Sequence, residues 1–283
     1  MLKKVKYAFK VSRFRFWIYT GGTFVIGYTL GAEKISDFYS LEYYVYLFYF
    51  FFLANVFIYG INDLFDLSTD KENPKKENKE HKLVQDKIKD LKFILYITIG
   101  ISLILLIFQS DWIERFVFLT FLFLSYSYSA KPFRFKSKPI IDFSSNMLYI
   151  MPGIFAYALV ASEFPPVLII LAGFFHISAM HIFSAIPDIR YDRNAGIITT
   201  PVLLGKEFSL ILCLGFWSML ASITIFLTRF HPLSFLILIY PIIPLLVLLS
   251  KKTKIEKVYW YLPYINTSLG GLLFIVLVFE TIM

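Results

Sequence analysis

Residues 42–63 read EYYVYLFYFFFLANVFIYGIND, and residues 64–70 continue LFDLSTD. The first stretch carries Glu42 and Asp63 at its two ends and no charged residue between them. About 20 consecutive apolar residues are enough for a helix to cross the hydrocarbon core of a bilayer, which is about 30 Å thick. The stretch therefore predicts a membrane-spanning helix that ends in acidic residues.

Similar apolar runs follow one another along the chain. We expect membrane spans at 14–32, 42–63, 91–109, 113–130, 140–161, 166–187, 208–228, 233–250 and 258–280. The composition agrees, because 58% of the residues are hydrophobic and 17% are charged, against about half and a quarter in soluble domains. The sequence predicts an all-α, polytopic membrane protein with nine transmembrane helices in a single domain over 1–283, and it argues against a soluble fold.

The basic residues indicate the orientation of these spans. The net charge is +8, which in a soluble chain would suggest nucleic acid as a partner. Here 25 of the 28 Lys and Arg residues lie in the N-terminal segment and in alternate loops, and the other three are Lys34, Arg115 and Arg229. Basic residues in short loops stay on the cytoplasmic side. We therefore predict a cytoplasmic N-terminus, a location in the plasma membrane and no nucleic-acid partner.

A first acidic motif follows the second span. Asn62, Asp66 and Asp70 are spaced by four residues, and on a helix this spacing places them along one face. Asp63 lies beside this row. Carboxylate and amide oxygens are ligands that suit a hard cation such as Mg²⁺. The motif therefore predicts a metal site at the cytoplasmic end of the span.

A second acidic motif follows the sixth span, where Asp188 and Asp192 are again four residues apart. A single acid at the end of a span is often only a solvated loop residue. Two such rows on the same side of the membrane are harder to explain in this way, since acids at membrane edges are functional by default. We predict that the two motifs bind Mg²⁺ and, through it, a diphosphate.

Basic residues should adjoin such a site, because ionisation of an allylic diphosphate requires neutralisation of the charge that builds on the leaving group. The candidates are in the loop after the fourth span and beside the second motif: Lys131, Arg134, Lys136, Lys138 and Arg193. For the lysines of 71–92, retention of the loop in the cytoplasm is the simpler interpretation.

At these residues the sequence resembles the UbiA superfamily of intramembrane prenyltransferases. The first motif of that family is Asn-x-x-x-Asp-x-x-x-Asp and the second is Asp-x-x-x-Asp, and both match here. A Tyr, Ser, Pro and Lys segment between them, Tyr126 to Lys138, also matches. The resemblance implies a nine-helix bundle around a central cavity, Mg²⁺ as the cofactor, and a prenyl diphosphate donor.

Within the family, the segments 126–142, 181–188 and 195–200 look most like the lycopene elongase branch. Quinone-forming members usually have Tyr before the second motif, where this chain has Ile186 and Pro187, and this difference argues against an aromatic acceptor. The resemblance implies transfer of a dimethylallyl unit to a linear carotenoid within the lipid bilayer. His181 would then orient that step or contact pyrophosphate, unless it only packs against a neighbouring helix.

Asp142 and Asn146 are also four residues apart and either line the mouth of the site or bond to another helix. With the resemblance, we predict catalytic roles for Asp66, Asp70, Asp188, Asp192 and His181. The metal ligands would be Asn62, Asp66, Asp70, Asp188 and Asp192. The substrate-binding residues would be Asn62, Asp63, Tyr126, Lys131, Arg134, Lys138, Asp142, Asn146 and Arg193.

Three alternatives stay open at this point. A prenyltransferase for an aromatic or glyceryl acceptor and a terpene cyclase would use the same metal site. A cation transporter could also place paired acids near the membrane. Transporters usually combine internal repeats with broken helices that meet at the middle of the membrane, whereas these acids lie at the ends of spans.

Overall fold

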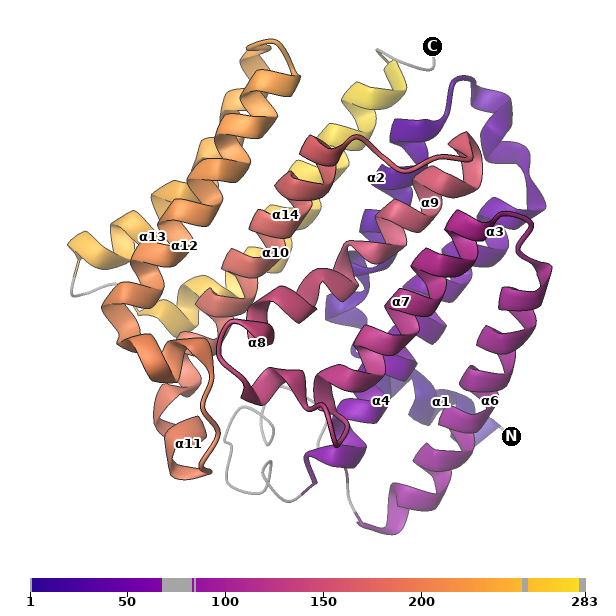
Figure 1. The fold of residues 1–283 in the computed structure, drawn as a ribbon, viewed down its shortest axis with the longest axis horizontal. Helices are drawn as coiled ribbons and strands as arrows, with labels where there is room; N and C mark the ends of the chain where they lie inside the picture. The colour runs from indigo at the N-terminus through magenta and orange to yellow at the C-terminus, as the bar shows by residue number, and fades with distance from the viewer. Residues whose placement is uncertain (1, 68–82, 84, 251–253, 280–283) are drawn as a thin grey trace. The chain divides into compact units, whose positions relative to one another are not determined.

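The computed structural model describes residues 2–67, 83, 85–250 and 254–279, and within these ranges all regular structure is helical (Figure 1). The internal contacts divide the chain into two units. Unit 1 comprises Met1–Arg134, Met151–Phe164 and Leu272–Met283, and unit 2 comprises Phe135–Ile150 and Pro165–Gly271.

Unit 1 contains seven α-helices: α1 (Leu2–Val11), α2 (Gly21–Gly31), α3 (Leu41–Phe48), α4 (Ala54–Phe65), α6 (Ile88–Phe108), α7 (Trp112–Ser129) and α9 (Met151–Ala161). Short 3₁₀ turns accompany them: η1 (Phe14–Tyr19), η2 (Ile35–Tyr39) and η5 (Gln85–Lys87). A π-helical turn, η3 (Tyr49–Leu53), joins α3 to α4, so that these elements form one continuous helix.

The core of unit 1 is aromatic. Tyr49, Phe50, Phe118 and Phe155 are all fully buried. Their rings contact one another, with centroids 5.2 Å apart for Tyr49 and Phe118 and 5.5 Å apart for Phe50 and Phe155. Fully burying a large apolar side chain stabilises a fold by about 1.5–3 kcal/mol. This cluster therefore fixes the packing of η3 against α7 and α9.

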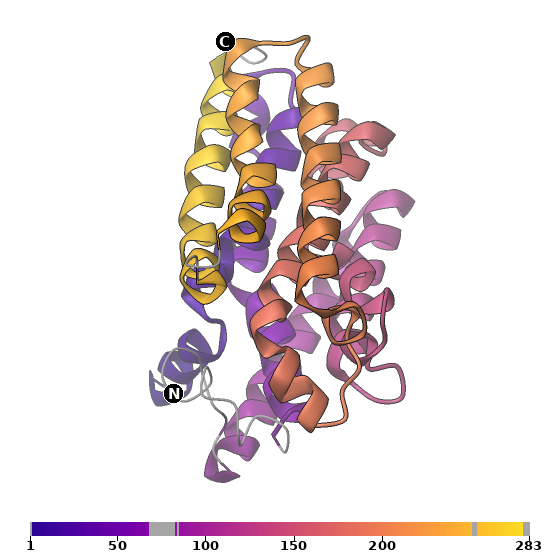
Figure 2. The ribbon, with the colours of Figure 1, turned by 90° about the vertical axis from the view of Figure 1, so that its left-hand side faces the viewer.

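Unit 2 contains α8 (Ile141–Ser144), α10 (Val167–Ala185), α11 (Ile189–Asn194), α12 (Thr200–Leu227) and α13 (Ile239–Leu249). Its 3₁₀ turns are η6 (Phe135–Ser137), η7 (Ser145–Tyr149), η8 (Ile186–Asp188) and η9 (Pro232–Leu238). Helix α12 packs against α10 and α13, and it runs beside α13 in Figures 1 and 2. The last helix, α14 (Ile255–Leu277), has residues in both units.

Seven helical segments in the described part of the chain are long and apolar enough to cross a membrane. They are Leu41–Phe65, Gln85–Phe108, Ile141–Ala161, Val167–Asn194, Thr200–Leu227, Pro232–Leu249 and Ile255–Leu277. Each of them overlaps one of the predicted spans. The span predicted at 208–228 begins earlier, at Thr200, and contains a non-helical residue, Gly205. The protein is therefore a multi-pass membrane protein.

Two of the nine predicted spans are not among these seven segments. The run 14–32 is not one helix, because η1 ends at Tyr19 and α2 begins at Gly21. The run 113–130 does form a helix, α7, but Glu114 and Arg115 lie in its first turn and three serines lie near its end. These features lower the hydropathy of α7. Nine spans therefore stay a prediction.

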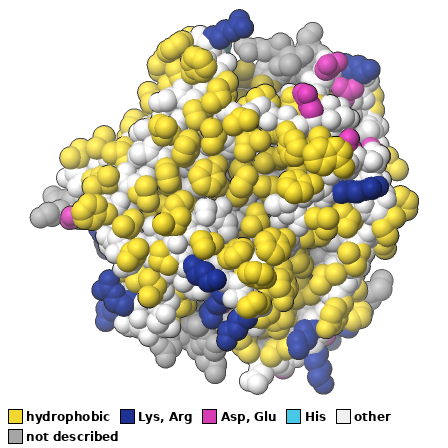
Figure 3. All heavy atoms as spheres, viewed as in Figure 1, with side chains coloured by type: hydrophobic (Ala, Val, Ile, Leu, Met, Phe, Trp, Pro, Cys, Tyr) yellow, Lys and Arg dark blue, Asp and Glu magenta, His cyan; other side chains and the backbone are white. Residues whose placement is uncertain are grey.

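Large apolar side chains cover much of the surface. Hydrophobic side chains predominate on the face shown in Figure 3. On α6, the side chains of Tyr96, Ile107 and Phe108 are each more than 70% exposed. Soluble monomers rarely expose contiguous apolar surface of this kind, and a helix that contacts lipid requires it.

Candidate active site

The first acidic motif lies at the end of α4. The backbone N–H of Asp66 donates to the carbonyl of Asn62 over 3.0 Å, and the Nδ2 of Asn62 donates to Oδ2 of Asp66 over 2.9 Å. Asn62 also donates to Oγ of Ser129 on α7 over 3.0 Å. The helix ends at Phe65, so the described residues contain one turn of the predicted row, and Asp70 lies outside them.

Two basic residues contact this motif. The Nη2 of Arg13 lies 2.6 Å from Oδ1 of Asp63, and both side chains are buried. The Arg13 guanidinium also stacks over the ring of Tyr59, 4.7 Å from its centroid. On the other side, Nη2 of Arg134 lies 3.5 Å from Oδ1 of Asp66. The two motif carboxylates that the structure describes are therefore each paired with an arginine.

Nearby residues of unit 1 have more open positions. Lys131 is exposed, and Tyr126 is 41% exposed with its ring edge-on to Phe65. Tyr7 of α1 interacts electrostatically with the motif. Burial of its side chain and, to a smaller extent, the negative charge of Asp63 raise the pKa of Tyr7 to about 12. Its phenol is therefore neutral throughout the physiological range.

The second acidic motif lies where α10 ends. Pro187 occupies the first turn of η8, Asp188 is the last residue of that turn, and Asp192 follows on α11. Both aspartates are half-buried, and Arg193 is exposed. The carbonyl of Asp192 accepts a hydrogen bond from the backbone N–H of Ile197 over 2.8 Å. Asp188 and Asp192 therefore lie on either side of the junction between η8 and α11.

The remaining predicted residues of unit 2 lie deeper in the fold. Asp142 and Asn146 are buried, whereas His181 is half-buried on α10 and Lys138 is exposed. Both carboxylate oxygens of Asp142 bond to Thr200 at the start of α12. Of the two interpretations of Asp142, the structure therefore contains the bond to another helix, and a role at the mouth of the site stays a prediction.

The donor atoms of both motifs fit a hard cation. Within the described residues no three His, Cys, Asp or Glu side chains converge on one point. The first motif nevertheless combines the carboxylate oxygens of Asp66 with the amide of Asn62, whose nitrogen donates to that carboxylate. Oxygen donors of this kind are the ligands that Mg²⁺ prefers.

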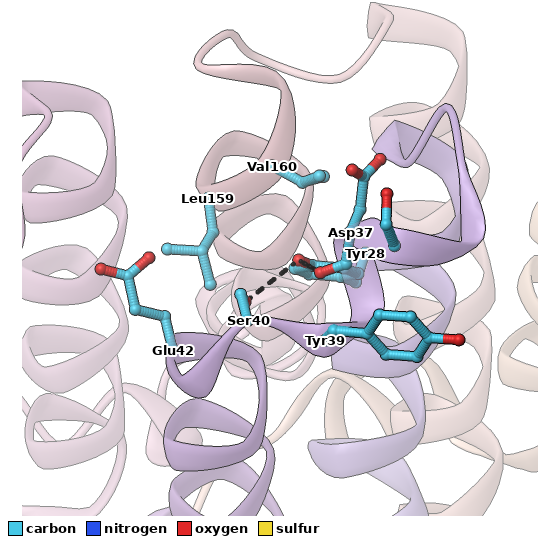
Figure 4. Close-up of a pocket in the computed structure, with 8 residues that line it drawn as sticks. Tyr28, Asp37, Tyr39, Ser40, Glu42, Leu159 and Val160 are labelled. Atoms are coloured by element: carbon cyan, nitrogen blue, oxygen red, sulfur yellow. Dashed lines mark hydrogen bonds between the residues drawn. The ribbon is translucent and has the colours of Figure 1, made fainter.

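A separate pocket lies at the other end of α3 and α4 in unit 1. It measures about 440 Å³ and includes Tyr28, Asp37, Ser40 and Glu42 in its lining. Figure 4 shows the side chains of Tyr28 and Ser40 directed toward each other. The helix between Ser40 and Asp66 spans Leu41–Phe65, which is about 37 Å at about 1.5 Å per residue. This pocket is therefore not part of the motif site.

Comparison with known proteins decides the family. A model of the "UbiA prenyltransferase family" matches residues 21–264. The chain belongs to the UbiA prenyltransferase family. The matched region contains every predicted site residue, including Asp70. The protein is therefore a prenyltransferase.

Relatives within the UbiA family refine this assignment. The chain is 36% identical to a lycopene elongase/hydratase of Haloferax volcanii over 95% of this chain and 88% of the relative. It is 35% identical to a lycopene elongase/hydratase of Halobacterium salinarum over 94% of each chain. The resemblance to the lycopene elongase branch of the family is thereby confirmed.

The fold matches solved UbiA structures. A UbiA homolog from Archaeoglobus fulgidus bound to GPP and Mg²⁺ superposes with a TM-score of 0.71 at 19% identity, covering 94% of this chain and 99% of that one. The same homolog bound to DMAPP and Mg²⁺ gives a TM-score of 0.70 at 18% identity, covering 95% and 99%. At these identities the structural similarity shows the fold of this protein and nothing more specific.

The sequence analysis missed three partners of the predicted site residues, two in unit 1 and one in unit 2. Arg13 pairs with Asp63, Ser129 accepts from Asn62, and Thr200 binds Asp142. In the sequence, Arg13 is one basic residue among several in the N-terminal segment. No spacing pattern connects these residues to their partners, which lie 50, 67 and 58 positions away in the sequence.

Proposed function

We propose that this enzyme transfers a prenyl group, specifically dimethylallyl, from its diphosphate to a lipophilic acceptor, a linear carotenoid such as lycopene. The observation that carries the proposal is the cluster at the end of α4, where the Asp66 carboxylate accepts from Asn62 and lies beside the Arg134 guanidinium. Its support in the sequence is the identity of 36% with a lycopene elongase/hydratase.

We assign the acids of both motifs to metal binding. The ligands would be Asn62, Asp66, Asp70, Asp188 and Asp192. Bound Mg²⁺ would supply positive charge against the charge that develops on the leaving diphosphate. The Nδ2 hydrogen bond of Asn62 holds the Asp66 carboxylate at the end of α4, so that this ligand is oriented before the cation arrives.

Basic side chains would hold the diphosphate oxygens. Arg134 already lies beside Asp66, and Lys131 is exposed in the same loop. Lys138 and Arg193 are the corresponding exposed residues of unit 2. An arginine presents a planar fork of donors that matches a phosphate, whereas a lysine acts as a point charge. The predicted substrate contacts of Asp63, Tyr126, Asp142 and Asn146 belong to the same proposal.

The acceptor's own double bond is the nucleophile in this transfer, so the protein has to orient the two substrates and need not supply a nucleophile. The C–O bond of the allylic diphosphate breaks, and its electron pair leaves with the diphosphate. The π electrons of the acceptor's terminal double bond then form the new C–C bond to the allylic carbon. The cation that results on the acceptor loses a proton or adds water, which then releases a proton. We assign the orientation of this step to His181.

The topology belongs to the same proposal. Nine spans with the N-terminus in the cytoplasm, in one domain over 1–283, place both motifs at cytoplasmic helix ends of the plasma membrane. The count requires η1 with α2, and also α7, to cross the bilayer in addition to the seven apolar segments. The basic residues support this orientation, since 25 of 28 fall on the side of the motifs.

Product analysis tests the proposal. Membranes that contain the protein would receive dimethylallyl diphosphate with lycopene, with aromatic acids or with a glyceryl phosphate, each with Mg²⁺ or with excess chelator. We expect a carotenoid lengthened by one or two five-carbon units, formed only with Mg²⁺. A prenylated aromatic or glyceryl product would overturn the acceptor assignment, and no pyrophosphate release with any of the acceptors would overturn the proposed transfer of dimethylallyl.

A further inference from the structure

The carboxylate of Asp142 is the centre of a buried hydrogen-bonded junction in unit 2. Its Oδ2 accepts from the backbone N–H of Thr200 over 2.6 Å, and its Oδ1 accepts from the Thr200 hydroxyl over 2.5 Å and from the N–H of Phe143 over 2.9 Å. Asp142 is fully buried and Thr200 is 3% exposed. Three bonds to one buried carboxylate, which also caps the positive end of α12, fix its position.

One arm of this junction reaches the basic loop. The backbone N–H of Asp142 donates to the carbonyl of Lys138 over 2.8 Å. The backbone N–H of Ile140, two residues after Lys138, donates to the Thr200 hydroxyl over 2.8 Å. The backbone on both sides of Pro139 is therefore tied to Thr200. The exposed side chain of Lys138 starts from a fixed backbone position.

The other arm reaches the second acidic motif. Thr200 follows Ile197 by three residues, and the N–H of Ile197 donates to the carbonyl of Asp192 over 2.8 Å. Three extended residues reach about 11 Å at most. Ile197 consequently lies within that reach of Thr200, and its N–H connects it to the backbone of Asp192.

The backbone of Ile140 indicates that the junction has one preferred arrangement. Ile140 has a φ of +72°, which is unfavourable for a β-branched residue. Its N–H bonds to Thr200, and its carbonyl accepts from both the N–H and the hydroxyl of Ser144, at 3.0 and 2.8 Å. A strained residue persists only where its surroundings over-determine its conformation.

We infer that Asp142 is a positioning residue, which through Thr200 sets the backbone of Asp192 for metal binding and that of Lys138 for diphosphate binding. This inference rests on the proposed function of those two residues. It assigns a shared support to two predicted site groups that lie far apart in the sequence. Neither Asp142 nor Thr200 needs to touch the substrate for this role.

Binding of Mn²⁺ in the presence of inorganic diphosphate, measured by electron paramagnetic resonance on the purified full-length protein, tests the inference. In Asp142→Asn the amide nitrogen faces a backbone N–H in either orientation, because both carboxylate oxygens accept from one. We expect the Mn²⁺ dissociation constant to rise about tenfold, the lower end of the effect of removing an outer-shell partner of a metal ligand. An unchanged constant would overturn the inference.

Thr200→Val is the second variant, since it keeps the backbone N–H bond to Asp142 and removes only the hydroxyl. We expect it to weaken Mn²⁺ binding as well, and Thr200→Ser to restore the wild-type constant. Weakening in Thr200→Ser equal to that in Thr200→Val would contradict a role of the hydroxyl. The pair remains informative if Asp142→Asn fails to fold.

Two controls separate this role from simpler ones. Tyr240→Phe removes another hydrogen bond between helices of unit 2, from Tyr240 to Asn266 at 2.7 Å, and should lower thermal stability while leaving Mn²⁺ binding unchanged. Weaker Mn²⁺ binding in this control would overturn the inference in favour of general destabilisation.

Asp188→Asn tests the metal site itself. Retained Mn²⁺ binding in this variant would contradict the proposed function. Weaker Mn²⁺ binding in Asp188→Asn but not in Asp142→Asn would contradict only the positioning role of Asp142.

Discussion

Arg13 and Asp63 form a buried ion pair with a separation of 2.6 Å between Nη2 and Oδ1, and their side chains are 9% and 1% exposed. The pair joins the residue before η1 to the end of α4. Arg13 has a φ of +51°, so that the chain turns sharply at the residue that carries the guanidinium. The first acidic motif is therefore held by the N-terminal segment as well as by its own helix.

Replacement of Arg13 should destabilise the protein strongly. Removal of one partner of a buried ion pair leaves an uncompensated charge and costs about 3–5 kcal/mol. We expect a loss of this size for Arg13→Ala in the free energy of unfolding in mixed detergent micelles. Lys87→Ala is the matched control, because its ion pair with Asp90 is exposed and should contribute less than about 1 kcal/mol. Equal losses in the two variants would contradict the structural role of Arg13.

The close approach of α2 and α9 gives a second prediction. A Cβ atom added at Gly27 would lie 2.0 Å from the carbonyl oxygen of Gly153, so the two backbones would have to separate. Gly27→Ala should destabilise unit 1 by about 1–3 kcal/mol or more. Gly100→Ala on α6 meets no atom within 4 Å and should be neutral or stabilising by up to about 1 kcal/mol. Thermal unfolding of both variants checks this, and a Gly27→Ala protein as stable as Gly100→Ala would refute the contact.

The topology can be tested through cysteine labelling. Cys213 is the only cysteine and is buried, so Cys213→Ala provides a background without thiols. Cysteines placed at Lys34 or Arg229 should react with a membrane-impermeant maleimide in intact cells. A cysteine at Lys87 should react only after permeabilisation. Labelling of the Lys87 position in intact cells would contradict the cytoplasmic orientation.

The helix predicted from the apolar run at 42–63 is confirmed, since the structure contains a helical segment over Leu41–Phe65. The break in the run 14–32 was not predictable from composition. It occurs at Thr20, whose hydroxyl donates to the carbonyl of Phe50 over 2.7 Å and accepts from Asn55 over 2.6 Å. These contacts come from residues 30 and 35 positions away in the sequence, and an apolar run of adequate length cannot reveal them.

In the candidate site too, some contacts are predictable from the sequence and others are not. The contact of Asn62 with Asp66 follows from helical periodicity, because residues four apart lie on one face. The partners Arg13 and Thr200 come from segments distant in the sequence, and a single sequence does not record which distant residues meet. The same limit applies to the aromatic residues, because two residues of the same type and hydropathy lie in the core, at Tyr49, and on the surface, at Tyr96.

The most direct test of the proposed chemistry is pyrophosphate release from dimethylallyl diphosphate, with lycopene present, by Asp66→Asn. Removal of a group that stabilises developing charge lowers rates by about 10²–10³-fold, and we expect a loss of at least about a hundredfold. Asp37→Asn, which removes a carboxylate from the pocket at the other end of α3, should match the wild type, and excess chelator should stop the wild type. Release by Asp66→Asn at the wild-type rate would contradict the assignment of the first motif to the diphosphate.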